Sequence, residues 1–519
     1  MKRTNTYISI LSFALLAPVL ATAQDTTVNY LSEEFQQRYK FFSTETISQS
    51  LLQLSNYAIL EGGFKQSGGS YKLAQAPEKQ TDIYLKTAGT KKLNKFLVSG
   101  SFSYERTTQD SVGYSLRYET EESTPFYFWA IKKGNWIAGK YNLSGMVSVP
   151  ISKNEKWTAG AGVTYQALNA WRAIDPRPDY FTYYLQTDGT LNYKITSKQT
   201  VGIQGGYIRK NMETITETRN DAFKNSVFYP EYSVWLQNGY GFSELRGSGS
   251  TKTTSIANKA QGWTMKGIYN INSSIGNFAI KGGYKKLKTD IIKKASASET
   301  NDTDSTYSTY SLRTWDASLY WKKQVRNHYW ALSAAYINEE GKDFNSNLHG
   351  INYVYSFESI SIQPTYGHYK NNQLQYELSL DGSIINTLKA DGTADQRAEY
   401  RFATVGATAA YYWHPQAGHI FKAKIRGGAQ TPIEASVNTP TQADAFTKNV
   451  AFADYYYYNE NSVNGSVELL YSFPIKAVTS FVKAGTQYTT AYTRTAGPFT
   501  TNRPGTNRWW WQLSIGVNL

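Results

Sequence analysis

The sequence of 519 residues contains no cysteine, which excludes a disulfide scaffold, thiolate zinc sites, iron–sulfur clusters and thiol nucleophiles. After residue 23 it also lacks any run of about 20 consecutive apolar residues, so no transmembrane helix is expected. No linker or shift in composition divides the chain, although a soluble chain of this length normally forms several domains. One large unit is therefore expected.

The amino terminus has the composition of a secretory signal peptide. Lys2 and Arg3 precede an apolar run from Ile8 to Leu20, and Ala21-Thr22-Ala23 forms a small-x-small cleavage site. The run is too short to span a bilayer, and the absence of cysteine excludes a lipoprotein anchor. Removal of residues 1–23 lowers the formal charge from +14 to +12. Export without a transmembrane helix leaves two classes, a soluble secreted β-protein and a transmembrane β-barrel.

The composition and periodicity of the remaining chain favour the barrel. Tyrosine is abundant, at 42 residues, and with Thr and Ser it favours strands over helices. Many segments alternate apolar with small or polar residues, with an aromatic residue at one or both ends, as lipid-facing barrel strands do. Three of these apolar stripes are Trp157, Ala159, Ala161, Val163 and Tyr165; Leu374, Tyr376, Leu378 and Leu380; and Val405, Ala407, Ala409 and Tyr411.

The last strand carries the strongest single signal. It resembles the terminal β-signal that outer-membrane barrels present to the barrel-assembly machinery, although an aromatic residue is more usual at the final position. The alternative is a buried edge strand of a secreted β-sandwich. The residues of the predicted insertion signal are Trp509, Trp511, Leu513, Ile515, Val517 and Leu519.

Short polar connections divide the chain into strand pairs. Their polar composition and short length are typical of periplasmic turns. They lie at about 152–156, 196–200, 272–277, 322–327, 369–373, 413–419 and 474–479. They predict an all-β fold, a single up-and-down antiparallel transmembrane β-barrel of about sixteen to eighteen strands over residues 57–519. The upper number applies if the hairpin from Gly62 to Lys86 joins the wall.

Residues 24–56 precede the barrel and have a spacing near the helical period. Leu31, Phe35, Tyr39 and Phe42 are separated by acidic and amide residues, which predicts a short amphipathic helix. This helical or extended segment plugs the lumen, lies under the periplasmic mouth, or is a tether.

Residues 171–178 have the sequence W-R-A-I-D-P-R-P, which is the main motif of a family resemblance. With the early Gly-rich hairpin, the S-G-S-F-S-Y strand at 99–104 and the Gly239-Tyr240-Gly241 loop, this motif resembles a Bacteroidota outer-membrane β-barrel family of unassigned function. The resemblance implies an accessory barrel that accompanies TonB-dependent transport systems. It carries no catalytic residue over to this chain.

The same motif supplies candidate binding residues. Two prolines stiffen the loop around Arg177, so Arg172 and Arg177 could meet an anionic solute or a lipopolysaccharide phosphate. The simpler interpretation is a rigid loop corner in which Asp175 pairs with Arg177 or Arg172.

Two aromatic tracts also admit more than one interpretation. We expect Tyr455, Tyr456, Tyr457 and Tyr458 on a strand near the outer interface, either stacking on sugar rings in the lumen or anchoring in headgroups. The tract from Phe126 to Trp129 admits the same two roles and contact with a partner protein as a third.

Chemistry-bearing motifs are scarce. The G-x-S-x-G, H-E-x-x-H and P-loop patterns are absent. His349, beside Asp343 and Asn345, is the one histidine near an outer loop. Glu299, Asp302 and Asp304 could hold Ca²⁺, but their spacing fits no defined calcium loop. The sequence therefore predicts a protein that is not an enzyme and has no cofactor and no metal site.

The basic charge has two explanations. Outer-loop lysines and arginines could bind lipopolysaccharide phosphates, or lumenal ones could bias a pore toward anions. Candidates for the lumen or rim are Lys281, Lys285, Lys293 and Lys294. Nucleic acid is not an expected partner, because the chain is exported.

These observations predict a protein of the cell outer membrane, surrounded by its lipid and lipopolysaccharide. The first hypothesis is a porin-like passive channel or an accessory subunit in nutrient uptake. The second is a non-conducting barrel whose long loops, at about 107–138 and 214–262, dock surface proteins, a surface lipoprotein or a TonB-dependent receptor. A hydrolase at the outer rim, built on His349, is the third.

Overall fold

The computed structural model describes residues 30–52, 54, 56–119, 122–247, 253–293, 305–440, 443–476, 478–492 and 497–519. The predicted signal peptide lies outside these ranges. So do Lys294 and the acidic residues Glu299, Asp302 and Asp304.

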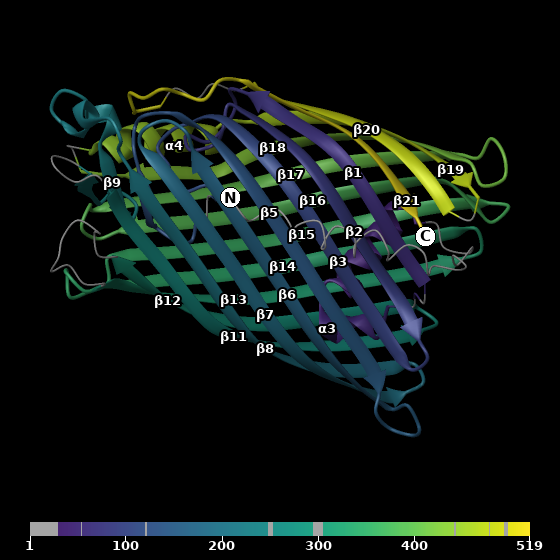
Figure 1. Cartoon of the computed structure of the whole chain (residues 1–519). Helices are drawn as coiled ribbons and strands as arrows, with labels where there is room; N and C mark the ends of the chain where they lie inside the picture. Colours follow the sequence, from purple (N-terminus) through teal and green to yellow (C-terminus); the bar gives the residue numbers. More distant parts are fainter. Residues whose placement is uncertain are drawn as a thin grey trace, which may run out of the picture.

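An 18-stranded antiparallel sheet closes on itself to form a barrel (Figure 1). Each strand pairs with its neighbours along the chain, and the last strand pairs with the first, so the predicted all-β up-and-down barrel is confirmed. The wall strands are β1 (Asn56–Gly69), β2 (Lys79–Leu93), β3 (Phe96–Val112), β5 (Gly134–Pro150), β6 (Trp157–Arg172), β7 (Arg177–Thr196), β8 (Gln199–Glu217), β11 (Thr253–Ser273), β12 (Gly276–Lys293), β13 (Ser305–Val325), β14 (His328–Asn345), β15 (Tyr353–Lys370), β16 (Gln373–Asp391), β17 (Gln396–Trp413), β18 (Ile420–Asn438), β19 (Ser462–Ile475), β20 (Val478–Ala491) and β21 (Asn507–Asn518).

The two-residue period of the sequence decides which side chains face outward. Apolar residues on the outer face stay exposed, among them Ile203 at 67% and Ile515 at 64%, while the inner face carries mainly small, polar and tyrosine side chains. The predicted stripe from Leu374 to Leu380 has one exception. A bulge shifts the register between His368 and Tyr369, so Leu374 turns inward and is buried.

The seam between β1 and β21 closes the barrel. Eleven residue pairs join these strands, from Ile59↔Asn518 to Gly69↔Arg508. The chain end extends the seam, because the Leu519 N–H donates to the Ala58 carbonyl at 2.8 Å. The hairpin of β1 and β2 therefore belongs to the wall, which gives the upper of the two predicted strand counts.

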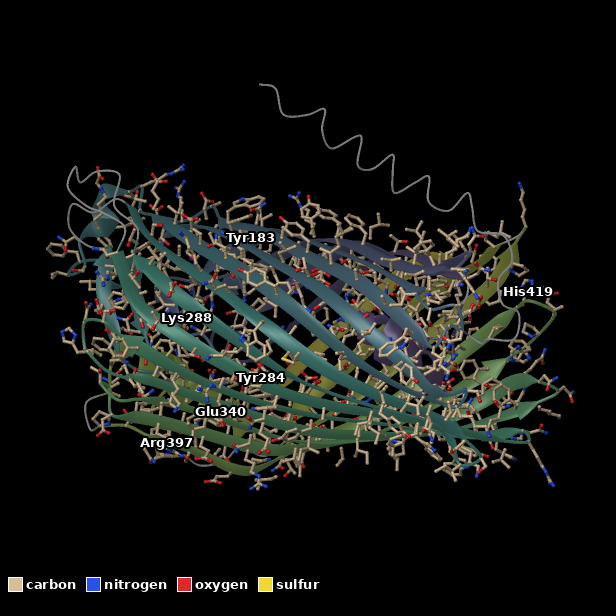
Figure 2. The ribbon with its side chains drawn as sticks, turned by 90° about the horizontal axis from the view of Figure 1, so that it is seen from below. Tyr183, Tyr284, Lys288, Glu340, Arg397 and His419 are labelled. Carbon is tan, nitrogen blue, oxygen red and sulfur yellow. The ribbon has the colours of Figure 1, made fainter. Side chains whose placement is uncertain are left out.

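The two ends of the barrel differ in their connections. Short turns lie at the turn end and join β2–β3, β5–β6, β7–β8, β11–β12, β13–β14, β15–β16, β17–β18 and β19–β20. All but the β2–β3 turn lie where the sequence predicts them. The loop end has the long connections, residues 113–133 and 218–252. Both are shorter than predicted, because β3, β5, β8 and β11 extend further. Figure 2 labels His419 at the turn end and Arg397 toward the loop end.

Elements outside the wall lie at both ends. Helices α2 (Glu33–Ser43) and α3 (Thr46–Gln49) contact inward residues near the turn end. At the loop end lie β4 (Phe126–Trp129), β9 (Val234–Asn238) and β10 (Ser243–Gly247), which form a small sheet, and η2 (Asp221–Lys224), η3 (Pro230–Tyr232), the π-helical η4 (Thr447–Ala451) and α4 (Phe452–Tyr458). Within the described ranges, no helix is long and apolar enough to cross a membrane.

Candidate functional site

The segment from residue 30 to 54, here called the plug, lies inside the barrel and begins with a capped helix. The Ser32 hydroxyl accepts the Phe35 N–H at 3.0 Å, which starts α2. The Glu377 carboxylate on β16 accepts the N–H groups of Glu33 at 2.8 Å and Glu34 at 3.1 Å. The wall thus places an anion at the positive end of the helix.

Glu33 carries the first of three carboxylates by which wall lysines hold the plug. Its oxygens lie 2.6 Å from the Lys422 ammonium and 3.2 Å from that of Lys424, both on β18. Burial raises the pKa of Glu33, but the two lysines outweigh burial and lower it below its usual range. Glu33 is therefore held ionised.

Glu34 makes the second contact, with a different wall strand. It pairs with Lys322 of β13 at 2.8 Å and with Arg38, one turn further along α2, at 3.2 Å. The Tyr320 hydroxyl also donates to it. Although burial raises the pKa of Glu34, Lys322 and Arg38 lower it overall. The two acidic residues of the first turn thus join α2 to two separate wall strands, β18 and β13.

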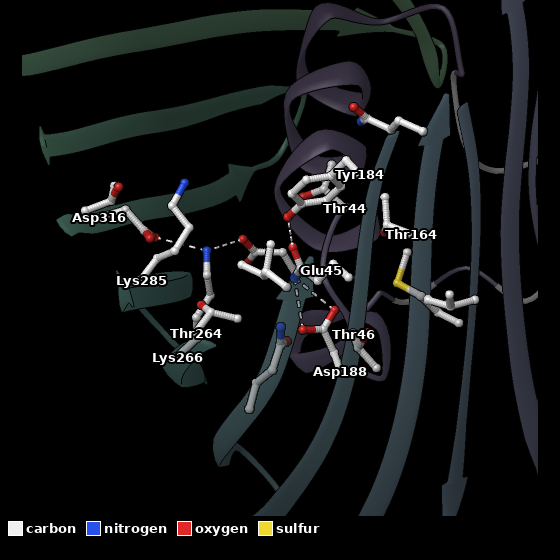
Figure 3. A pocket seen from close by; sticks show the side chains of 17 residues that line it. Thr44, Glu45, Thr46, Thr164, Tyr184, Asp188, Thr264, Lys266, Lys285 and Asp316 are labelled. Carbon is white, nitrogen blue, oxygen red and sulfur yellow. Dashed lines mark hydrogen bonds and ion pairs between the residues drawn. The ribbon is translucent and has the colours of Figure 1, made fainter. Parts of the chain in front are cut away.

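Glu45, between α2 and α3, makes the third contact. Its carboxylate lies 2.6 Å from Lys266 on β11 and 2.9 Å from Lys281 on β12, and Lys266 also pairs with Asp316 at 3.2 Å (Figure 3). Lys281 and Lys266 lower the pKa of Glu45 against the opposing effect of burial. Lys281, predicted for the lumen or rim, is thus a lumenal residue that binds the plug.

Helix α3 is held by hydrogen bonds to polar side chains of the wall. The Ile47 N–H donates to the Gln204 side chain on β8, and the Ile47 carbonyl accepts from Asn192 on β7, both at 3.0 Å. Gln49 donates to the Ser99 hydroxyl on β3 at 3.0 Å. The plug therefore contacts strands around most of the barrel.

Glycines on β6 leave room for the plug. A Cβ atom at Gly162 would lie 2.2 Å from the Thr46 hydroxyl oxygen, and one at Gly160 would lie 3.3 Å from the Thr46 methyl carbon. A Cβ at Gly189, by contrast, would meet nothing within 4 Å. Close approach of the α3 backbone to this wall thus depends on the missing side chain at Gly162.

An aromatic contact supplements these polar ones. Phe35, Phe41 and Phe42 of α2 are buried against wall residues, with Tyr30 stacked on Tyr57 of β1 at 5.0 Å. The phenylalanines give α2 its apolar face, which is the face that the sequence spacing predicts.

Two cavities flank the junction of α2 and α3 and share Thr44 and Glu45 in their linings. One has a volume of about 360 Å³ and is lined by amide, hydroxyl and charged side chains that include Gln186, Asp188 and Lys285 (Figure 3). The other, of about 600 Å³, lies against β13 to β17. Lys285, predicted for the lumen or rim, lines the first cavity.

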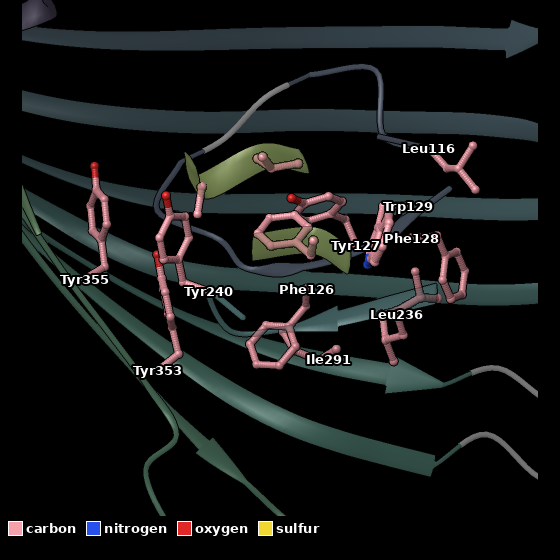
Figure 4. Close-up of a cluster of buried hydrophobic side chains, with 14 of the residues drawn as sticks. Leu116, Phe126, Tyr127, Phe128, Trp129, Leu236, Tyr240, Ile291, Tyr353 and Tyr355 are labelled. Carbon is pink, nitrogen blue, oxygen red and sulfur yellow. The ribbon is translucent and has the colours of Figure 1, made fainter. Parts of the chain in front are cut away.

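The loop end is filled by a buried aromatic cluster, here called the loop cluster (Figure 4). Loop residues of β4, β9 and η4 pack against inward tyrosines of β13, β15 and β17. Trp129 lies 5.9 Å from Trp235 in a stacked arrangement. The buried members are Leu116, Phe126, Tyr127, Phe128, Trp129, Ala130, Val234, Leu236, Tyr240, Ile256, Ile291, Tyr307, Tyr310, Tyr353, Tyr355, Ala398, Tyr400, Val437, Phe446, Val450, Ala451 and Phe452.

Polar contacts fasten the loops to the wall. Asp391 of β16 accepts the N–H groups of Tyr240 and Phe242, each at 2.8 Å. Glu122 pairs with Lys389 at 3.1 Å. The predicted long loops therefore fold back into the barrel mouth, and the tract from Phe126 to Trp129 is buried.

The predicted anion-binding motif forms a loop corner. Arg177 donates to Asp175 at 2.7 Å, and the second Asp175 oxygen accepts the Asn220 N–H at 2.9 Å. Arg172 is buried and donates to the Lys132 carbonyl at 3.1 Å, so the structure separates it from that ion pair.

The prediction of a strand at Tyr455–Tyr458 is wrong, because these tyrosines lie on α4. Their rings are divided among several contacts: Tyr458 stacks on Tyr400 at 4.5 Å, Tyr457 lies 4.7 Å from Tyr71, and the Tyr456 hydroxyl donates to the Phe499 carbonyl at 2.8 Å. Tertiary packing overrides the β-propensity of this tract.

Within the described part of the chain, His349 has no acidic partner. This residue is exposed, while Asp343 accepts the N–H groups of Asn352 at 2.8 Å and Tyr353 at 2.7 Å. Among the described residues there is no group of three or more potential metal ligands.

The strand topology, the outward apolar stripes and the occupied lumen together define a large β-barrel of the transmembrane class with an internal plug. The chain belongs to a family of unknown function, DUF6850, whose model matches residues 46–519. No curated protein matches it.

Solved structures of similar architecture include three transport proteins, each 8% identical to this chain. They are the ferric preacinetobactin receptor BauA from Acinetobacter baumannii (TM-score 0.39, covering 90% of this chain and 80% of that one), the ferric citrate transporter FecA (0.41, 89% and 79%) and the FrpB iron transporter from Neisseria meningitidis (0.40, 90% and 82%). At these scores the likeness carries no argument about function.

Proposed function

We propose that this protein is an outer-membrane barrel for nutrient uptake whose lumen is closed at rest by the plug and the loop cluster. Exposed apolar residues support membrane insertion, since side chains such as Val405 and Leu380, each 61% exposed, would be costly to present to water all round a soluble protein. The predicted signal peptide and the closed antiparallel sheet favour the outer membrane over other membranes.

The manner in which the plug is held carries the proposal. Ion pairs and hydrogen bonds to the wall provide much of its docking, and water can replace such contacts when the plug moves. A barrel of this size encloses an aqueous lumen if it is not blocked, and cavities already lie beside the plug. The predicted passive channel is thereby refined to a channel that conducts only after the plug and loops shift.

The experiment is single-channel recording of the refolded mature chain in a planar bilayer. We expect no conductance at rest and reversible openings in moderate urea, which weakens plug docking before the hydrogen-bonded wall. The paired variant Glu33→Gln/Glu45→Gln should open at lower urea than the parent, while Gly189→Ala, on the lipid face, should not differ. A folded barrel that stays closed in every condition would contradict the proposal.

Docking of a partner is the second candidate, favoured by one loop. Val227 and Phe228, between η2 and η3, are 82% and 76% exposed and form an apolar tip that no barrel wall requires. We propose that this tip contacts a surface protein, a surface lipoprotein or a TonB-dependent receptor. Cross-linking in cells should capture the same partner with the parent and lose it with Val227→Ser/Phe228→Ser.

The remaining predicted roles are narrower. We propose that Arg177 and Asp175 shape the loop corner, while an anion-binding role for Arg172 would need its buried guanidinium to become exposed. A catalytic role has no support in the described residues, since His349 has no acidic partner there.

A further inference from the structure

Exposed basic residues gather on the turns, and none of them forms an ion pair with another described residue. Nine exposed lysines and arginines lie on six of the eight turns, against the single exposed acidic residue Glu155 among the described residues there. Three of them, Lys92, Lys95 and Lys194, line a cavity beside Leu51 of the plug and therefore face the lumen. We call the other six the turn rim: Lys153, Lys156, Lys198, Arg326, Lys370 and Lys476.

The loop end differs in how its exposed charges are arranged. Some basic residues there pair with acidic neighbours, as in Lys133–Glu78 at 2.7 Å and Arg397–Glu399 at 3.1 Å.

Exposed apolar residues accompany the basic ones. Ile151 (59% exposed) precedes Lys153, Ile195 (45%) precedes Lys198, and Ile475 (50%) precedes Lys476. An apolar side chain followed within three residues by a cation suits a membrane interface, where the first contacts acyl chains and the second reaches the phosphates.

We propose that the turn rim binds the headgroups of anionic phospholipids in the leaflet that surrounds the turn end. The distribution of the cations favours lipid over an acidic protein, because lipid surrounds the barrel whereas a protein partner would cover one arc. The proposal rests on membrane insertion as proposed above, and it adds a lipid preference that uptake does not require.

Native mass spectrometry of the full mature chain tests this proposal. The protein is reconstituted in vesicles of equal parts phosphatidylcholine and phosphatidylglycerol, then extracted, and the retained lipids are counted. We expect phosphatidylglycerol to be enriched at least about threefold, since each interfacial cation attracts anionic lipid. High salt during extraction should reduce the enrichment.

Two six-site variants provide the contrast. Changing Lys153, Lys156, Lys198, Arg326, Lys370 and Lys476 to Gln should abolish the enrichment. Changing Lys79, Lys133, Arg219, Lys342, Arg397 and Lys448, which lie toward the loop end, should preserve it. Both variants must migrate as folded barrels on unheated gels, which tests membrane insertion separately from lipid preference.

Two results would overturn the proposal. One is equal retention of the two lipids by the folded parent. The other is saturable binding of soluble polyglutamate that the turn-end variant loses while lipid retention does not change, which would assign the rim to an acidic protein.

Discussion

The two closures of the barrel are built from different chemistry. At the turn end, Glu33, Glu34 and Glu45 of the plug meet wall lysines, and the packing tolerates cavities of about 360 and 600 Å³ beside it. At the loop end, more than twenty buried residues form one aromatic cluster, and the cavity there measures about 90 Å³.

This difference distinguishes a removable element from a fixed one. Buried ion pairs add little net stability relative to apolar packing, although they fix a specific geometry. When the plug moves, both charges of each pair become hydrated again, which offsets the loss of the pair. When the loops open, a dense aromatic cluster loses many packing contacts together, and the free-energy cost is larger. We therefore expect the plug to leave its site more easily than the loop cluster opens.

The largest effect should come from the loop cluster. Trp129→Ala removes a buried ring that packs on Trp235 and Phe446, and should lower the free energy of loop opening by about 3–5 kcal/mol. Hydrogen exchange of the β4 and β9 amides measures this opening. Phe228→Ala, at a site 76% exposed, should change it by less than about 0.5 kcal/mol. Equal effects of the two substitutions would mean that the cluster does not hold the loops.

A smaller loss of free energy is expected for docking of the plug. Glu45→Gln leaves Lys281, whose side chain is 8% exposed, without its carboxylate partner, whereas Lys266 retains Asp316. Docking should weaken by about 2–3 kcal/mol, below the full value for a buried pair because the Glu45 side chain is 21% exposed. Hydrogen exchange at the Ile47 amide measures this loss of docking free energy. Neutralising both Arg397 and Glu399, a pair at the surface, should lower stability by less than about 1 kcal/mol. A loss as large as that of Glu45→Gln would contradict a special role for the buried plug contacts.

The two closures should also respond to pH in opposite directions. The lowered pKa values of the plug carboxylates give docking that is complete above their ordinary pKa of 4.5 and is lost as the pH falls further. Burial raises the pKa of Asp454 on α4 from 3.8 to about 7, so the contribution of this carboxyl to the stability of the loop cluster is greatest in acid and falls as the pH rises between these values.

The slope for the loop cluster should reach about 1 kcal/mol per pH unit. Exchange of β4 amides, corrected for intrinsic rates, would show it, and Asp454→Asn should flatten it. Parallel pH dependence at the plug and the loop cluster would contradict their separate chemistry.

Sequence periodicity predicted the wall because each strand obeys a local rule, with alternate residues facing lipid. It failed at Leu374, where a bulge inserts one residue, and at Tyr455–Tyr458, where burial among loop residues selects a helix. Both failures have non-local causes.

The candidate site was only partly predictable for the same reason. The spacing of Phe35, Tyr39 and Phe42 indicated the helix, and Lys281 and Lys285 were among the candidates for the lumen or rim. Their partners could not be identified, since Glu33 and Lys422 are separated by 389 positions along the chain. The role of Gly162 depends on Thr46, which no periodicity connects to it.

A reversible cross-link between plug and wall tests the central claim most directly. A Cβ at Gly162 would lie 3.4 Å from that of Thr46, close to disulfide geometry, and the chain has no cysteine of its own. The variant Thr46→Cys/Gly162→Cys is recorded in a planar bilayer under moderate urea. We predict that the oxidised protein stays closed, and that reduction restores openings with an anion preference set by the vacated wall lysines. Openings that are the same before and after reduction would show that the plug does not close the lumen.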